Sequence, residues 1–90
     1  MVDKGLTRSI GVCNCGIPQM MDILTYAKIK PAVNQIELHP YLPQHALTKF
    51  LMRFGIHSVA YAPLGATNWV FKDPEYHDVS LIEDPFILQL

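Results

Sequence analysis

Apolar positions along the chain change their spacing several times, and each spacing predicts a different element. Residues 9–13 form a short run that favours β structure, and Gly16 and Pro18 end it. From Pro18 onward the apolar residues recur with a period of 3.6, which is typical of one stripe along a helix. Since Pro31 cannot continue that helix, the pattern predicts a helix over residues 18–28.

The same alternation is repeated further along the chain. Residues 32–38 predict a second strand, and the two prolines within residues 39–43 predict a turn. A second helical stripe follows over residues 44–54, with Gly55 at the position where a helix C-cap belongs. Residues 56–62 predict a third strand, so the order of elements is βαβαβ.

This order predicts an α/β fold with parallel strands and right-handed crossovers. We assign the βαβαβ core to residues 1–65 and treat residues 1–90 as part of a single domain. Residues 66–85 predict a long irregular loop, which in compact domains is often a lid or a binding loop. Residues 86–90 are typical of the start of a helix.

Composition and charge exclude several classes of protein. The chain is 50% hydrophobic and 17% charged, with a net charge of −1, which argues against disorder and against binding to nucleic acid or anionic lipid. No apolar run approaches the roughly 20 residues that span a bilayer, and the N-terminal residues carry no signal-peptide pattern. We therefore expect a cytoplasmic protein that binds neither nucleic acid nor membranes.

Two cysteines, Cys13 and Cys15, are the only ones in the chain. A secreted disulfide scaffold carries more cysteines at wider spacing, so we expect reduced thiols. The four histidines show no ligand spacing with these cysteines, and we expect no metal site.

Polar and aromatic residues gather where the predicted strands end. Asn14 follows the first strand, Gln35 and Glu37 lie late in the second, and Tyr61 lies late in the third. Because α/β folds bind ligands at the carboxyl ends of their strands, this set predicts a site for an uncharged polar ligand. Its amides offer donors and acceptors, and its tyrosine offers a flat face for stacking.

Each of these residues also has a purely structural interpretation. Asn14 suits a turn, Gln35 and Glu37 would face water on an edge strand, and Tyr61 would fit a core with its hydroxyl satisfied. For Glu37 and His39, a structural hydrogen bond near the turn is favoured over an acid–base pair.

Three segments together resemble the aldo-keto reductases in order and spacing: residues 5–14 (GLTRSIGVCN), 33–42 (VNQIELHPYL) and 60–65 (AYAPLG). Residues 81–85 (LIEDP) resemble the stretch that follows the family's cofactor-covering loop. The resemblance implies part of a (β/α)8 TIM barrel, at about strands five to seven.

The resemblance also implies roles for individual residues. In the family, the residues matching Cys13, Asn14 and Gln35 hydrogen-bond the nicotinamide carboxamide, and the residue matching Tyr61 stacks on the ring. Backbone groups near Leu64 and the following loop pass along the pyrophosphate. The implied cofactor is NADP(H), with NAD(H) as the alternative. The implied cofactor-binding residues are Cys13, Asn14, Gln35, Tyr61, Ala62, Leu64 and Ala66.

Several features depart from the family pattern. Cys15 stands where an aromatic residue is usual, and Ala62 and Ala66 stand where serines are common. Losing a hydroxyl removes a hydrogen bond that contributes on the order of 1 kcal/mol. The proton-donating tyrosine of the family, with its lysine, aspartate and histidine, belongs to strands before Met1, and the segment that reads the adenosine 2′-phosphate belongs after Leu90. We therefore expect no catalytic residue in this chain.

Two interpretations follow. In the first, the chain carries the nicotinamide-binding part of an NAD(P)H-dependent oxidoreductase that reduces small aldehydes and ketones to alcohols, and it is inactive alone. In the second, it is a non-enzymatic remnant that binds nucleotide or serves an interaction or structural role. If the chain exists alone, three parallel strands with open edges would favour self-association or a partner chain.

Overall fold

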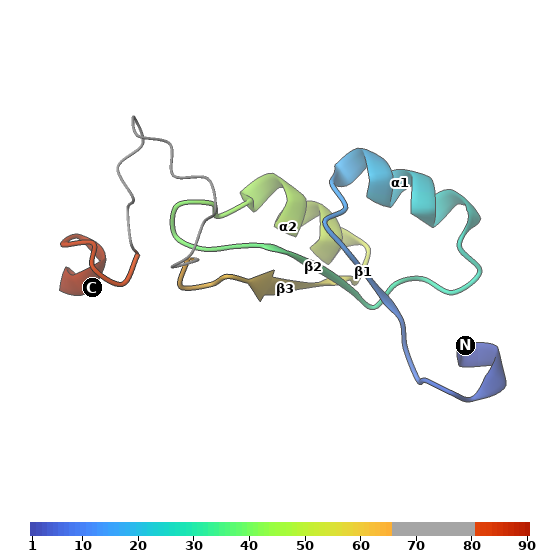
Figure 1. Ribbon diagram of the computed structural model, residues 1–90. Helices are drawn as coiled ribbons and strands as arrows, with labels where there is room; N and C mark the ends of the chain where they lie inside the picture. Colours follow the sequence, from blue (N-terminus) through green and yellow to red (C-terminus); the bar gives the residue numbers. More distant parts are fainter. Residues whose placement is uncertain (66–80) are drawn as a thin grey trace, which may run out of the picture.

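A three-stranded parallel sheet forms the centre of the computed structural model, which describes residues 1–65 and 81–90 (Figure 1). The strand order is β1-β2-β3, so β2 is paired on both sides. In chain order the elements are η1 (Val2–Lys4), β1 (Gly11–Cys13), α1 (Ile17–Tyr26), β2 (Val33–Glu37), α2 (His45–Arg53), β3 (His57–Tyr61) and η2 (Ile87–Gln89). The predicted βαβαβ order and the parallel pairing are confirmed.

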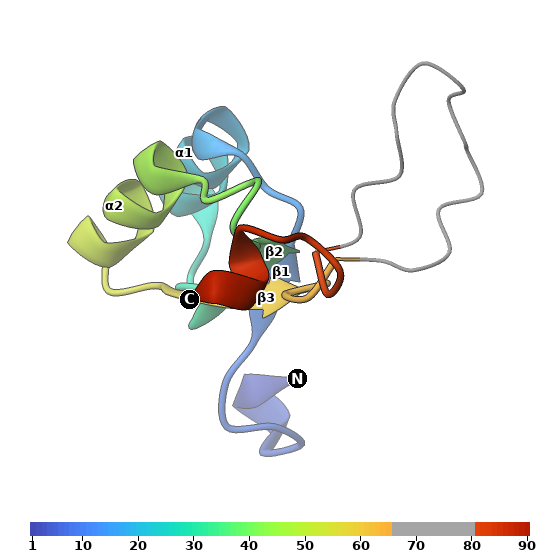
Figure 2. The same ribbon diagram turned by 90° about the vertical axis from the view of Figure 1, so that its left-hand side faces the viewer.

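Both α-helices lie on the same face of the sheet, as the two views show (Figures 1 and 2). In a sheet whose strands follow one another in order, two right-handed crossovers pass over the same face. The core forms between these helices and the sheet. Its buried members are Met20 from α1, Ile36 from β2, Leu47 and Leu51 from α2, and Ile56 just before β3.

No described helix packs on the opposite face of the sheet. Gln35, Val59 and Tyr61 are exposed there, although β2 is the central strand. The sequence-based alternative that placed Gln35 on an edge strand is therefore wrong. Gln35 is exposed because the described helices cover the other face of the sheet, while both edges of β2 are paired.

Helices and strands are slightly shorter than the sequence pattern predicted. The first helix ends at Tyr26 instead of residue 28, because Ala27 already has an extended backbone (ψ 119°). The first strand begins at Gly11, although Ile10 still accepts a 2.7 Å hydrogen bond from the Ala32 amide. After α2, Gly55 adopts a left-handed φ of 64°, so the predicted helix stop is confirmed.

The proline-containing segment after β2 forms the predicted turn. The His39 and Leu42 backbones pair as an isolated antiparallel bridge, with N–O distances of 3.3 and 2.8 Å. Gln44, which precedes α2, has a positive φ of 46°, and its side chain donates to the Glu37 carbonyl at 2.6 Å. This bond ties the start of α2 to the end of β2.

Residues 81–90 return to the end of the sheet. Leu81 is buried, and a Cβ placed on Gly65 would lie 3.1 Å from its side chain. Asp84 then accepts hydrogen bonds from the Phe86 and Ile87 amides at 2.8 and 3.1 Å, immediately before and at the start of the 3-10 helix η2. The predicted helix start is thus a single 3-10 turn. Of the predicted loop at 66–85, residues 66–80 lie outside the described residues.

Among residues 1–65 and 81–90, no helix has the length and hydropathy that crossing a membrane would require.

Neighbouring residues of α2 allow a direct test of the core. Leu51 is fully buried, whereas Met52 is 76% exposed. Leu51→Ala is expected to lower the free energy of unfolding by about 2–5 kcal/mol, because it removes buried methyl groups and leaves a cavity. Met52→Ala should change it by no more than about 0.5 kcal/mol. Urea unfolding followed by circular dichroism measures both, and equal losses would contradict the assignment of this core.

Candidate functional site

The uncovered face of the sheet carries three of the seven predicted site residues, Cys13, Gln35 and Tyr61, in two successive rows of that face. Cys13, Gln35 and Val59 are register partners, and Glu37 pairs with Tyr61 in the next row. Since register partners on parallel strands point to the same side of the sheet, these side chains share one face. A hollow of about 410 Å³ lies over the first row, lined by Gly11, Val12, Cys13, Val33, Gln35 and Val59.

Asn14 takes the chain out of β1 in a left-handed turn. Its φ is 53°, a conformation that asparagine tolerates better than most residues, and its side chain is exposed. Its backbone amide donates to the Gln35 carbonyl at 2.9 Å. Asn14 is therefore a turn former, as the structural interpretation holds, and it also lies directly beside Gln35.

Tyr61 ends β3 with its surface 38% exposed, so it is not an ordinary core residue. The backbone turns sharply after it. Ala62 has a left-handed φ of 48°, and its carbonyl accepts a 2.9 Å hydrogen bond from the Gly65 amide. Leu64 in this turn is exposed, and Ala66 lies outside the described residues.

A second, smaller hollow of about 230 Å³ lies at the carboxyl edge of the sheet. Asn14 and Tyr61 line it together with Glu37 and Gln44, along with Cys15, Gly16, Ile36, Leu42 and Leu47. The predicted site residues are thus divided between two hollows, with Cys13 and Gln35 in the first. Because the backbone turns in a left-handed conformation at Asn14, the Asn14 side chain lies in the second hollow and not in the row of Cys13.

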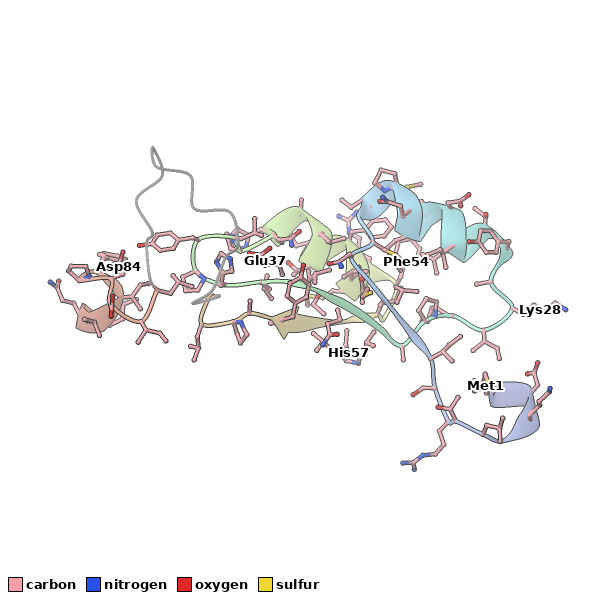
Figure 3. The ribbon with its side chains drawn as sticks, viewed as in Figure 1. Met1, Lys28, Glu37, Phe54, His57 and Asp84 are labelled. Atoms are coloured by element: carbon pink, nitrogen blue, oxygen red, sulfur yellow. The ribbon has the colours of Figure 1, made fainter. Side chains whose placement is uncertain are left out.

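Glu37 and His39 interact as the structural interpretation predicted. The imidazole Nε2 lies 2.8 Å from a carboxylate oxygen of Glu37, and both side chains are largely buried (Figure 3 labels Glu37). Facing a carboxylate, Nε2 is the nitrogen assigned the proton. His39 Nδ1 is buried and has no hydrogen-bond partner among the described residues. The pair links the end of β2 to the following turn.

Tyr41 and Asp84 join the turn after β2 to the C-terminal segment, where Figure 3 labels Asp84. The Tyr41 hydroxyl donates to the Asp84 carboxylate. This hydrogen bond is the main cause that raises the pKa of Tyr41, and desolvation and the carboxylate charge add to it. The same bond lowers the pKa of Asp84, with help from the Ile87 and Phe86 amides.

One polar residue in the middle of β2 was not singled out from the sequence. Asn34 is completely buried on the helix-covered face. The alternation of side chains along β2 could have predicted this burial. Asn34 points to the same face as the buried Ile36, whereas Gln35 and Glu37 point to the opposite face.

Cys13 and Cys15 are both free thiols. Within the part of the chain that the structure describes, no group of three or more histidine, cysteine or acidic side chains is arranged to hold a metal ion.

Comparison with known families agrees with this geometry. The model of the aldo/keto reductase family matches residues 1–80. The chain belongs to the aldo-keto reductase family.

Individual family members extend the likeness to sequence and coordinates. This aldo-keto reductase chain is 54% identical over 70 residues to 4-dihydromethyl-trisporate dehydrogenase of Mucor mucedo, covering 78% of this chain and 22% of that protein. The structure of aldose reductase from Giardia lamblia superposes with a TM-score of 0.73 at 48% identity, covering 79% and 23% of the two chains. An aldo-keto reductase complexed with NADPH gives a TM-score of 0.66 at 43% identity, covering 68% and 19%.

The chain therefore spans about a fifth of the length of these relatives. Its parallel sheet and helices fit part of an α/β TIM barrel, in agreement with the expected fold class.

The Tyr41–Asp84 bond makes a pH-dependent prediction for this aldo-keto reductase chain. Asp84→Asn should lower the pKa of Tyr41 toward its ordinary value, because the hydroxyl loses the anionic acceptor that retains its proton. Ultraviolet absorbance of tyrosinate followed against pH measures the tyrosine pKa values. The difference between the unsubstituted chain and Tyr41→Phe identifies the contribution of Tyr41 to that titration. An unchanged titration in Asp84→Asn would contradict the bond.

The Tyr41–Asp84 hydrogen bond also makes the stability of the fold depend on pH, because it shifts the pKa of both groups in the folded state. A carboxyl group whose pKa is lowered in the folded state stabilises above its unfolded pKa, and this is lost as the pH falls through the folded pKa. A phenol whose pKa is raised stabilises below its unfolded pKa, and this is lost as the pH rises through the folded pKa. The bond should therefore stabilise the fold between these two limits.

Proposed function

We propose that this chain is the nicotinamide-binding part of an NAD(P)H-dependent oxidoreductase that reduces aldehydes and ketones to alcohols. One observation carries the proposal: Cys13, Gln35 and Tyr61 share the uncovered face of three adjacent parallel strands. Cys13 and Tyr61 end β1 and β3, and Gln35 lies two residues before the end of β2. Membership of the aldo-keto reductase family and the likeness to a member complexed with NADPH support it.

The side chains present fit the nicotinamide end of such a cofactor. A carboxamide has both a donor and an acceptor, and the amides of Asn14 and Gln35, with the thiol of Cys13, offer partners for both. Tyr61 offers a half-exposed ring for stacking, so that one face of the nicotinamide is covered and the other stays open. When bound, the cofactor supplies the hydride. The residues of this chain bind and orient the ring.

The turn after β3 is the proposed path of the pyrophosphate. Backbone groups near Leu64 would lie along it, as the family resemblance implies. Ala62 and Ala66 have no hydroxyl to offer, and in the family the residue matching Ala66 often contacts phosphate. We therefore propose weaker phosphate binding than in members that have a serine there, by on the order of 1 kcal/mol for the lost hydrogen bond. Ala66 is part of the proposal through the resemblance alone.

We place the chain at about strands five to seven of the eight-stranded barrel, with residues 1–65 as its core and 66–90 as a cofactor-loop-like segment and helix start. The catalytic tyrosine, lysine, aspartate and histidine of the family match no residue of this chain, so we propose no catalytic residue within it. The proposal includes NADP(H) as cofactor, NAD(H) as the alternative, a small carbonyl compound as substrate and a cytoplasmic location.

A second candidate function rests on the uncovered sheet face. Val59 and Tyr61 are each 38% exposed on it, and among the described residues β1 and β3 are each paired along one edge only. Exposed apolar faces and open strand edges favour association with another chain. The second proposal is a non-enzymatic remnant that binds nucleotide or takes an interaction role through self-association or a partner.

Calorimetric titration with NADPH separates these two functions. The chain should bind NADPH, and Tyr61→Ala should raise the Kd about tenfold, because the ring loses its stacking partner. His57→Ala is the matched control, since His57 lies on the same face at the other end of β3. A flat titration of the unsubstituted chain would reject nicotinamide binding and favour the interaction role.

A turnover assay tests whether catalysis requires residues that this chain does not contain. The purified chain, mixed with NADPH and an aromatic aldehyde, should consume no NADPH above the enzyme-free rate, because no group here matches the family's proton donor. Loss of nicotinamide absorbance above that background would contradict the proposal that the chain is inactive alone.

A further inference from the structure

Asn34 is a buried polar residue in an otherwise apolar core. It is fully buried, and its register partners on the helix-covered face are Val12 of β1 and Ser58 of β3. A buried amide without partners costs about 1–3 kcal/mol, so its hydrogen bonds should explain its place there.

Both ends of the Asn34 amide bind the main chain of one residue, Cys15. The side-chain Nδ2 donates to the Cys15 carbonyl at 2.7 Å, and Oδ1 accepts from the Cys15 amide at 3.4 Å. Cys15 lies beyond the end of β1, so Asn34 clamps the backbone just after that strand stops. This is a connection between chain segments 19 residues apart.

The residue between β1 and this clamp is Asn14. Its own amide donates to the Gln35 carbonyl at 2.9 Å, while the next residue, Cys15, is held by Asn34. Two consecutive residues of β2 thus fix both sides of Asn14. Its positive φ of 53° is sparsely populated, and such a conformation persists where its surroundings hold it.

We propose that Asn34 is a positioning residue, which acts through Asn14 by holding its left-handed backbone and so aiming its side chain at the cofactor carboxamide. This inference rests on the proposed function, in which Asn14 binds the carboxamide. The inference adds to that function, because the orientation of the nicotinamide ring would then depend partly on Asn34, a residue that does not contact the ring.

The substitution that tests this role is Asn34→Leu, which keeps a similar volume and removes both hydrogen bonds to Cys15. It is expected to raise the Kd for NADPH about threefold to tenfold, the equivalent of one hydrogen bond. Asn34→Asp is the second variant if Asn34→Leu does not fold, because a carboxylate also cannot donate to the Cys15 carbonyl. Ser58→Ala is the matched control, since Ser58 lies in the same row of the same sheet face.

A double-mutant cycle with Asn14→Ala distinguishes positioning from general support of the fold. If Asn34 acts through Asn14, its substitution should have no further effect on the Kd once Asn14→Ala is present. A full additional loss in that background would overturn the proposal. Folded fractions measured by circular dichroism correct each Kd.

A cofactor-free measurement completes the test. The Cα chemical shift of Asn14 reports its backbone conformation, and Asn34→Leu should move it while Ser58→Ala should not. An unmoved shift, or an unchanged Kd in Asn34→Leu, would overturn the role of Asn34 and leave the proposed function standing. Failure of the unsubstituted chain to bind NADPH would overturn both.

Discussion

Parallel pairing of β2 with both of its neighbours is the constraint on which the remaining structure depends. Because side chains alternate along a strand, the register that pairs Gln35 with Cys13 and Val59 also sends Asn34 and Ile36 to the opposite face. A slip of one residue would exchange the two faces and bury Gln35 in the core. The register therefore determines both what is packed and what is presented to a ligand.

Packing of one face leaves the other uncovered by the residues that the structure describes. The two crossovers put α1 and α2 over the same side of the sheet, and the main buried cluster lies on that side. The free side carries the polar and aromatic residues proposed to hold nicotinamide. In a chain that spans about a fifth of its aldo-keto reductase relatives, the same free side also accounts for the proposed tendency to associate.

Backbone strain is concentrated at the edge of the sheet where we propose the site. Non-glycine residues with positive φ directly follow β1 and β3, at Asn14 and Ala62. Such conformations are costly and are typical of binding sites, where surrounding contacts hold them. For Asn14 those contacts come from Asn34 and Gln35, so the middle strand supplies both a candidate ligand contact and the restraint on its neighbour.

The sequence by itself determined the elements, and it predicts the edge of the sheet at which a ligand would bind. Apolar periodicity and the stops at Pro31 and Gly55 are local signals, and they located every helix and strand of the core to within about two residues. The tendency of α/β folds to bind ligands at strand ends predicts roles for Gln35 and Tyr61 from the sequence alone. Only the tertiary structure decided the clamp of Asn34 on Cys15 and the bond of Tyr41 to Asp84, which join residues 19 and 43 positions apart. Periodicity describes neighbours along the chain, whereas these contacts exist only after the sheet has brought distant segments to a common edge.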